Sequence, residues 1–411
     1  MATEQIVVVG GGLAAGRLAS EYRAAGGEQD VTIVGAEPDP PYNRPPLTKG
    51  YLRGELEREG TLVRPLEEWE EAVVELRLDT TVEAIHPDEH EVELAGGERL
   101  AYGTLVLATG ARPRTLPLPG GDLVGVHTYR TLADADAVRA ALDEAHSAIV
   151  IGGSFIGAEA AASLRRRGLD VTLVERGPML MPQLASPDLS TELAELYRGE
   201  GVELLLEAQL EELTGNGKLL TGARLADGTT VEGYLAIVGI GVQPNVELAE
   251  AAGATVDDGV VVDERFRTSL DDVYAIGDIA RFPDPTSGRL RRIEHWSNSS
   301  AQGGHLGRQL AGDRTRYDEL PVFFTMLFDT KLQLLGDVEP AVECVVRGSL
   351  AEGRLIGFHL TEERELVGAV VHGQAADLVA ELGQLIRDRP TVDDPTRLLD
   401  ENLRPAEAIA G

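Results

Sequence analysis

Two glycine-rich segments carry residue types that could bind the phosphates of a dinucleotide. In the first, IVVVGGGLAAGRLA at 6–19, Gly10, Gly12 and Ala15 have the Gly-x-Gly-x-x-Gly/Ala spacing. Glycines there let the backbone approach a pyrophosphate, and the N-terminus of the following helix favours its negative charge. Glu37 ends the next apolar run and could accept a hydrogen bond from a ribose hydroxyl. The pattern predicts a dinucleotide site, with a ligand-free βαβ unit as the alternative.

The second glycine-rich segment, IVIGGSFIGAEAA at 149–161, repeats this pattern with one departure. Gly152 and Gly157 flank the turn, and Ser154 stands where a glycine is expected. Two explanations for Ser154 stay open: the pyrophosphate binds slightly further out, or the hydroxyl donates to it. Glu175 ends the next apolar run, and an acid there favours NADH over NADPH because it repels a 2′-phosphate. The adjacent Arg176 could soften that preference.

Metal and thiol chemistry have little support in the sequence. The single cysteine, Cys344, excludes an internal disulfide and a metal site built on a cysteine pair. His86 and His90 belong to HPDEH, whose proline and flanking alternating segments are typical of a hairpin turn. We therefore expect no metal site.

Parallel sheets are needed to hold the two glycine-rich segments. Apolar runs alternate with helical patterns, which predicts an α/β fold with two Rossmann-like, three-layer domains. Apolar strands that end at Gly110 and Asp278 complete the first nucleotide fold, and AIVGIGVQPN closes the second. Short strands and an amphipathic helix then predict a C-terminal α+β domain. The expected boundaries are 1–113 with 245–318 for the first domain, 114–244 for the second and 319–411 for the third.

Composition narrows the classes of partner. The chain has 411 residues and a formal net charge of −32, which argues against nucleic acid because phosphate binding needs clustered Lys and Arg. No apolar run is long enough to cross a membrane, and the N-terminus enters a strand without a targeting pattern, so we expect a cytoplasmic protein. The basic run RRRG at 165–168 is interpreted as the end of a helix.

An ordered set of motifs relates the chain to one family of enzymes. It contains GGGLAAG, PYNRPPLTK, LATGARPR, RTLADA, GGSFIGAE, GIGVQPN, AIGD and EHWSN. This set resembles the FAD-dependent, NADH-using ferredoxin and rubredoxin reductases of oxygenase systems, which are relatives of glutathione reductase and apoptosis-inducing factor. The resemblance spans residues 1 to about 310. It implies that the first domain binds FAD and the second binds NADH. It also implies that a small iron–sulfur protein, ferredoxin or rubredoxin, is the electron acceptor, and that the reductase is a monomer or homodimer.

The resemblance also implies site residues. Lys49 and Glu159 meet beside flavin N5 in the resembled reductases, where a cation stabilises the negative charge that arrives with hydride. A surface ion pair of little consequence is the alternative. The implied FAD residues are Gly10, Gly12, Ala14, Ala15, Glu37, Arg44, Lys49, Val82, Ala108, Thr109, Gly110, Arg130, Asp278, Glu294, His295 and Trp296. The implied NAD residues are Gly152, Gly153, Ser154, Ile156, Gly157, Glu159, Glu175 and Gly241.

Two departures from related enzymes bear on the electron acceptor. Disulfide reductases place a cysteine pair just after the strand that ends at Glu37, whereas this chain has PPYNRPPLTKG there, so electrons must leave directly to an external acceptor. A tryptophan-rich segment that covers the flavin in relatives is VFFTMLFDTKLQ here, with Phe324 in a Trp position and Met326 and Leu327 in polar ones. A reductase of a quinone or other small acceptor therefore stays open, as does a redox sensor with slow turnover.

A local basic patch would be needed to dock an acidic ferredoxin on this acidic chain. RLRR supplies Arg289, Arg291 and Arg292 just before the EHW motif. We predict that these arginines form the patch, with a solvated hairpin as the alternative.

Overall fold

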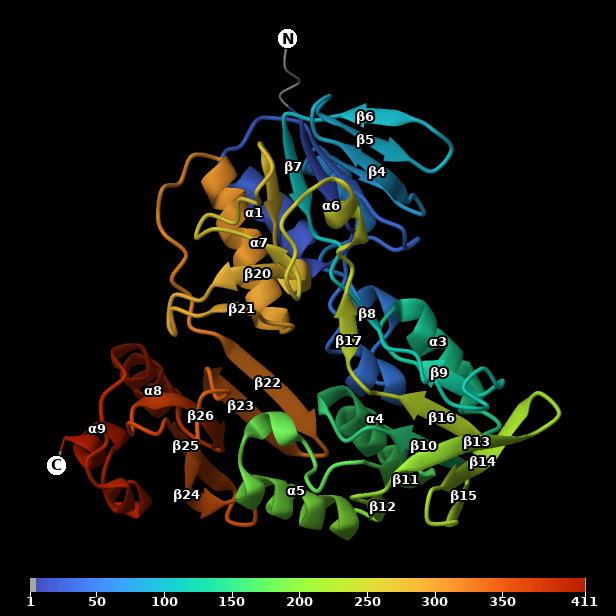
Figure 1. Cartoon of the computed structure of the whole chain (residues 1–411), viewed down its shortest axis with the longest axis vertical. Helices are drawn as coiled ribbons and strands as arrows, with labels where there is room; N and C mark the ends of the chain where they lie inside the picture. The colour runs from blue at the N-terminus through green and yellow to red at the C-terminus, as the bar shows by residue number, and fades with distance from the viewer. Residues whose placement is uncertain (1–4, 411) are drawn as a thin grey trace. The chain divides into compact units, whose positions relative to one another are not determined.

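The computed structural model describes residues 5–410 and divides the chain into two compact units (Figure 1). Unit 1 comprises Met1–Arg44, Glu57–Arg112 and Gln243–Glu319, and unit 2 comprises Pro45–Leu56, Pro113–Val242 and Leu320–Gly411. The sequence predicts all of 1–113 in the first domain, but Pro45–Leu56 groups with unit 2. The reason is that its one-turn π-helix η1 (Leu47–Tyr51) packs against helices α3 (Leu132–Ala141) and α4 (Phe155–Arg166) of that unit.

Unit 1 is built on a five-stranded parallel sheet in the order β19-β7-β1-β2-β3. Its central strands β1, β2 and β7 are apolar runs, and β1 and β2 are buried at every position, which suits strands covered on both faces. Helices α1 and α7 pack side by side in this unit (Figure 1). The bounds are β1 Ile6–Val9, β2 Val31–Val34, β3 Val74–Arg77, β7 Thr104–Leu107, β19 Val273–Ala275, α1 Leu13–Ala24 and α7 Trp296–Leu310.

Smaller elements complete unit 1. The predicted hairpin around HPDEH is confirmed, because β4 and β5 pair in antiparallel fashion on either side of it. A second hairpin, β20–β21, carries the RLRR arginines. The bounds are β4 Val82–His86, β5 Glu91–Leu94, β6 Arg99–Ala101, β18 Val260–Val261, β20 Ala280–Pro283, β21 Leu290–Arg292, α2 Leu66–Glu71, α6 Glu247–Ala251, η2 Arg58–Thr61 and η4 Gly277–Ile279.

Unit 2 repeats the parallel architecture in the order β12-β11-β10-β16-β9. An antiparallel meander, β13-β14-β15, follows β12, and the short strands β8 and β17 pair with each other. The bounds are β8 Ala111–Pro113, β9 Val126–Thr128, β10 Ser147–Ile151, β11 Asp170–Val174, β12 Val202–Leu205, β13 Leu210–Asn216, β14 Leu219–Leu225, β15 Thr230–Glu232, β16 Leu235–Val238, β17 Val242–Pro244, α3 Leu132–Ala141, α4 Phe155–Arg166, α5 Pro187–Gly199 and η3 Pro182–Leu184.

The C-terminal part of unit 2 is an antiparallel sheet in the order β22-β23-β26-β25-β24, with α8 packed on β23 and β26. It has its own apolar core. The predicted fold class, two nucleotide-type parallel sheets plus an α+β region, is confirmed. The bounds are β22 Val322–Leu327, β23 Thr330–Gly336, β24 Glu343–Ser349, β25 Arg354–Leu360, β26 Leu366–His372, α8 Ala376–Asp388, α9 Pro405–Ile409 and η5 Pro395–Leu399.

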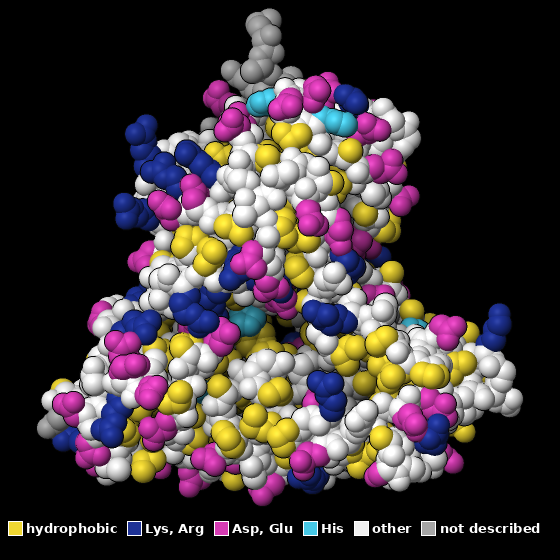
Figure 2. All heavy atoms as spheres, viewed as in Figure 1, with side chains coloured by type: hydrophobic (Ala, Val, Ile, Leu, Met, Phe, Trp, Pro, Cys, Tyr) yellow, Lys and Arg dark blue, Asp and Glu magenta, His cyan; other side chains and the backbone are white. Residues whose placement is uncertain are grey.

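Charged side chains have structural partners at the end of α4. Arg165 donates to the carbonyl of Glu200, Arg166 pairs with Asp329 at 2.6 Å, and Arg167 donates to a backbone carbonyl at 3.1 Å. Helix α4 ends at Arg166 with Arg167 as its C-cap, so the interpretation of RRRG as a helix end is confirmed. Acidic and basic side chains are interspersed on the face drawn in Figure 2. Within residues 5–410, no helix is long and apolar enough to cross a membrane.

Candidate functional site

The first glycine turn of unit 1 leaves the start of α1 open to an anion. Gly12 is the N-cap, no side chain caps the helix, and no acid lies in its first turn. A Cβ built on Gly12 would meet no heavy atom within 4 Å. The first N–H groups of a helix have no intrahelical partner and favour negative charge. The turn after β1 therefore fits a pyrophosphate.

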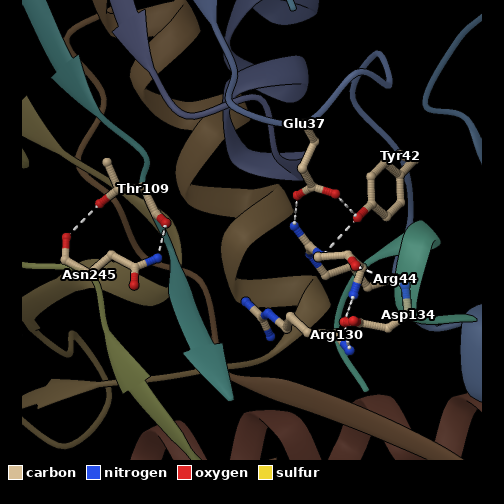
Figure 3. A network of polar contacts seen from close by, with 8 residues as sticks. Glu37, Tyr42, Arg44, Thr109, Arg130, Asp134 and Asn245 are labelled. Carbon is tan, nitrogen blue, oxygen red and sulfur yellow. Dashed lines mark hydrogen bonds and ion pairs between the residues drawn. The ribbon is translucent and has the colours of Figure 1, made fainter. Parts of the chain in front are cut away.

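Glu37 is held at the end of β2 by two side chains (Figure 3). Tyr42 donates its hydroxyl to one carboxylate oxygen at 2.5 Å, and Arg44 donates to the other at 3.0 Å. Arg44 also donates to the Tyr42 hydroxyl at 2.9 Å. Burial lowers the pKa of the Arg44 guanidinium, but Tyr42 and Glu37 outweigh it, so the pKa lies above its ordinary value. Arg44 thus stays charged beside Glu37.

The loop after β7 is fastened to the loop after β17. Thr109 donates its hydroxyl to the carbonyl of Asn245 at 2.8 Å, and the Asn245 amide donates to the carbonyl of Thr109 at 2.8 Å (Figure 3). Thr109 was predicted to be a site residue, whereas Asn245 was not. The sequence signal for Asn245 is its place at the end of GIGVQPN. This pair fixes the Ala108–Gly110 loop.

Two anchors organise the end of unit 1 that holds η4 and α7. Ser299 donates to a carboxylate oxygen of Asp278 at 2.7 Å, and Trp296 donates its indole N–H to the side chain of Asn43 at 2.8 Å. Burial lowers the pKa of His295 to about 4, so its ring is neutral near pH 7. The structure therefore gives Asp278 and Trp296 fixed positions in unit 1.

The remaining predicted positions lie as follows. Arg130 precedes α3 in unit 2, and its backbone N–H donates to the carboxylate of Asp134, in the first turn of α3, at 3.0 Å (Figure 3). Val82 is buried at the start of β4, and Glu294 pairs with Arg292. Ala14 and Ala15 are buried in the first turn of α1, Gly241 has a φ of +97° before β17, and Ile156 is 40% exposed in the first turn of α4.

The second glycine turn, in unit 2, is tied together more tightly than the first. Ser154, the N-cap of α4, donates its hydroxyl to the carbonyl of Gly239 at 3.0 Å instead of capping the helix. A hydrogen bond from Ser154 to a phosphate would require this bond to break. Like α1, α4 has no side-chain cap and no acid in its first turn, so its N–H groups fit a pyrophosphate.

Backbone groups of the same turn hold Glu175. The N–H groups of Gly153 and Gly177 each donate to one carboxylate oxygen at 2.6 Å. The third fingerprint position is equally constrained, because a Cβ on Gly157 would lie 1.9 Å from the carbonyl oxygen of Gly152. In unit 2 the acid and the glycine turn are therefore one hydrogen-bonded assembly.

Lys49 and Glu159 form a buried ion pair in unit 2. The Lys49 ammonium lies 2.6 Å from Oε2 of Glu159, and the two side chains are 14% and 4% exposed. Thr48 donates its hydroxyl to the same oxygen at 2.6 Å, and Thr325 donates to Oε1 at 2.7 Å. The burial argues against a surface pair of little consequence. A role for the pair in hydride transfer stays a prediction.

The segment that carries Lys49 is fastened on two sides. Tyr129 donates its hydroxyl to the carbonyl of Leu47 at 2.6 Å, and Ser163 of α4 donates to the carbonyl of Thr48 at 2.6 Å. Tyr51 donates to Asp136 of α3. These contacts make η1 part of the rigid surroundings of Glu159.

The prediction that Arg289, Arg291 and Arg292 form a basic docking patch is wrong for Arg291 and Arg292. Arg291 is 18% exposed and pairs with the buried carboxylate of Asp284 at 3.3 Å. Arg292 is 9% exposed and pairs with Asp258 and Glu294. Both side chains neutralise acids within unit 1, so only Arg289 points largely to solvent.

Neither the cysteine nor a cluster of metal ligands forms a further candidate site among the described residues. Burial raises the pKa of Cys344 to about 11, so its thiol is protonated near pH 7. Among residues 5–410, no group of three potential ligands is arranged to hold a metal ion.

Comparison with known proteins gives one consistent family. A family model described as pyridine nucleotide-disulphide oxidoreductase matches residues 4–303. Rhodocoxin reductase of Rhodococcus erythropolis is 35% identical over 403 residues, which cover 98% of this chain and 94% of the relative. A monodehydroascorbate reductase of Oryza sativa subsp. japonica is 34% identical over 413 residues, covering 95% and 84%. The covalent putidaredoxin reductase–putidaredoxin complex superposes with a TM-score of 0.93 at 34% identity, covering 100% of this chain and 99% of that chain.

Proposed function

The chain belongs to the pyridine nucleotide-disulphide oxidoreductase family, and we propose that it is an FAD-dependent reductase that passes electrons from NADH to a ferredoxin or rubredoxin serving an oxygenase. The observation that carries the proposal is the buried Lys49–Glu159 ion pair beside the second glycine turn, in a chain that has a single cysteine. The pair suits hydride chemistry, and a lone cysteine cannot form a dithiol relay.

Unit 1 supplies the residues that would hold FAD. The uncapped start of α1 offers backbone N–H groups to the pyrophosphate, and Glu37 offers a fixed carboxylate to a ribose hydroxyl. Asp278, oriented by Ser299, offers a second acceptor for the ribityl or phosphate side. When bound, FAD accepts two electrons as hydride and releases them one at a time.

Lys49 would supply a preorganised positive charge for that chemistry. Its ammonium is held by Glu159 and also donates to the carbonyl of Pro45 at 3.2 Å, so its position is fixed before a ligand binds. A fixed charge in a water-poor site stabilises developing negative charge more than a solvated one does. Glu159 would hold the ammonium in place.

Unit 2 would bind the nicotinamide cofactor at α4. Glu175 is fixed at the end of β11 by the Gly153 and Gly177 amides, and its remaining lone pairs could accept from a ribose hydroxyl. This arrangement favours NADH, since a 2′-phosphate would meet the carboxylate. Arg176 is exposed next to it and could moderate the preference.

The acceptor proposal depends on what the chain lacks and what its relatives are named for. Cys344 is the only cysteine and its thiol is protonated near pH 7, so electrons would leave to an external acceptor. The names rhodocoxin reductase and putidaredoxin reductase support an electron-carrier protein in that role. The monodehydroascorbate reductase relative supports a small organic acceptor as the second candidate.

The two candidates are separated by steady-state reduction of cytochrome c with NADH. For a ferredoxin reductase, we expect cytochrome c reduction to depend on added ferredoxin, and a quinone or an ascorbate radical to be a poor substitute. Fast reduction of a small acceptor with no stimulation by any tested ferredoxin would support the second candidate. Sluggish turnover with every acceptor would favour a redox sensor and contradict both.

A further inference from the structure

Glu159 connects three separate segments of unit 2. Oε2 accepts from Thr48 and Lys49 of the η1 segment, while Oε1 accepts from Thr325 of β22. Thr325 lies 276 residues after Lys49 in the chain, in the C-terminal sheet. Helix α4 and strand β22 lie side by side in this unit (Figure 1).

The two carboxylate oxygens need separate donors because the group is buried. Glu159 is 4% exposed, so each oxygen that lacks a donor carries unsolvated negative charge. The terminal torsion of a glutamate is soft, and a donor on one oxygen alone leaves the plane of the carboxylate free to turn. A second donor on Oε1 fixes this plane and thereby the oxygen that faces the Lys49 ammonium.

Thr325 is well placed to be that second donor. It is fully buried, and its strand is pinned by antiparallel pairing with Leu332 of β23. The neighbouring Phe323 packs on Phe155, in the first turn of α4, with ring centroids 4.2 Å apart. The hydroxyl of Thr325 is therefore held in register with the helix that carries Glu159.

We infer that Thr325 is a positioning residue for the Lys49–Glu159 pair, through which the C-terminal sheet sets the geometry of hydride acceptance. This inference rests on the proposed function. It assigns a role to β22. In this strand Phe324 replaces a tryptophan of the resembled reductases, and Met326 and Leu327 replace polar residues. Thr325 touches only Glu159 in this role and is not itself a catalytic group.

The first test measures reduction of the bound flavin by NADH in an anaerobic stopped-flow instrument. Thr325→Val keeps the side-chain shape and removes the donor, so we expect the limiting rate to fall about ten-fold, as for loss of a hydrogen bond to a charged group, while the apparent Kd for NADH changes less than about two-fold. Thr325→Ser should restore most of the rate. Thr361→Val removes another buried hydroxyl, just after β25 of the same sheet, which accepts from the backbone N–H of Glu365 at 3.2 Å, and should leave the rate unchanged.

The second test needs no turnover. The chain has three lysines, Lys49, Lys218 and Lys331, so the rate of amine modification at each can be followed by peptide mass spectrometry. We expect Thr325→Val to speed modification of Lys49 several-fold relative to Lys218, because a loosened carboxylate releases the ammonium. Thr325→Ser and Thr361→Val should match the wild type.

The outcomes separate the inference from the proposed function. If NADH does not reduce the flavin of the wild-type protein, the proposed function is contradicted. The lysine-modification assay would still test the role of Thr325. An unchanged limiting rate in Thr325→Val, or equal losses in the Val and Ser variants, would overturn the inference. If Thr325→Val does not retain flavin, Thr325→Cys is measured instead. Because a thiol is a weak donor, the limiting rate of this variant should fall below that of the wild type by less than ten-fold.

Discussion

The two βαβ units use the same fingerprint but secure it in different ways. In unit 1, side chains from outside the turn, Tyr42 and Arg44, hold Glu37, and the space at Gly12 is open. In unit 2, the backbone N–H groups of Gly153 and Gly177 hold Glu175. The acid of unit 1 is therefore separable from its glycine turn, whereas in unit 2 a change in either alters the other.

The third fingerprint position should show the largest difference between the units. It is Ala15 in unit 1 and Gly157 in unit 2, where a Cβ would lie 1.9 Å from a backbone oxygen. Gly157→Ala should lower the free energy of unfolding by about 3 kcal/mol, since neither side of that contact is a flexible side chain. Denaturant unfolding followed by far-UV circular dichroism measures this loss.

The matched change in unit 1 is Ala15→Gly, which should cost only about 1 kcal/mol through helix propensity. Equal losses for the two variants would show that the turns are packed alike. That result would contradict the conclusion that the glycine turn of unit 2 is more tightly packed than the turn of unit 1.

Buried histidines give the next largest effect, and it depends on pH. His359 of unit 2 is fully buried and donates to the carbonyl of Leu184 at 2.7 Å, and burial lowers its pKa to about 4. The unfolded chain, with a histidine pKa of about 6.5, takes up the proton first, so stability is full above pH 6.5 and falls by about 1.4 kcal/mol per pH unit towards pH 4. Burial lowers the pKa of His295 of unit 1 to about 4 as well, so this histidine should contribute a slope of similar size.

Unfolding titrations at several pH values between 4 and 7 test this expectation. His359→Gln keeps a donor for Leu184 and cannot titrate, so the pH dependence of its stability should lose the share that His359 contributes and keep that of His295. A variant whose pH dependence matches the wild type would show that His359 is not the group responsible.

Much of this arrangement follows from the sequence, and what does not has a physical reason. The glycine turns, Glu37 and Glu175 are local patterns, so they could be placed before the structure was known. Ser154 could be named but its partner, the Gly239 carbonyl, could not, because a hydroxyl does not encode which distant carbonyl it meets.

Long-range partners account for the misses. Thr48 and Thr325 are ordinary threonines in the sequence, and only the fold brings them to Glu159. Arg291 and Arg292 formed an apparent basic patch in the sequence because the acids that pair with them, Asp284 and Asp258, lie outside the run. A run of like charges does not reveal its counterions.

The preference for NADH over NADPH should also differ between the two units, with a smaller change in free energy. Glu175→Ala should narrow the ratio of kcat/KM for NADH over NADPH about ten-fold, or roughly 1.4 kcal/mol, since the repelling carboxylate is gone. Glu37→Ala, the matched change in unit 1, should leave this ratio unaltered and weaken flavin retention instead. A wild type that prefers NADPH would assign the choice to Arg176.

The second fingerprint position should give the smallest effect. Ser154→Gly removes one hydroxyl that donates to Gly239, so we expect a loss of stability below about 1 kcal/mol and little change in the KM for NADH. Gly12→Ser in unit 1 should fold normally and lose flavin affinity, because its side chain would enter open space beside α1. A marked rise in KM for Ser154→Gly would mean that the hydroxyl turns to the phosphate when NADH binds.

The most direct measurement of the proposed function is a two-step anaerobic stopped-flow experiment. The flavin protein is first mixed with one equivalent of NADH and then with an oxidised ferredoxin, and flavin and iron–sulfur absorbance are followed separately. We expect rapid loss of flavin absorbance in the first step, followed by its recovery as two ferredoxins are reduced per flavin. Rapid flavin reduction with no transfer to any ferredoxin or rubredoxin, and prompt transfer to a quinone, would contradict the proposed function.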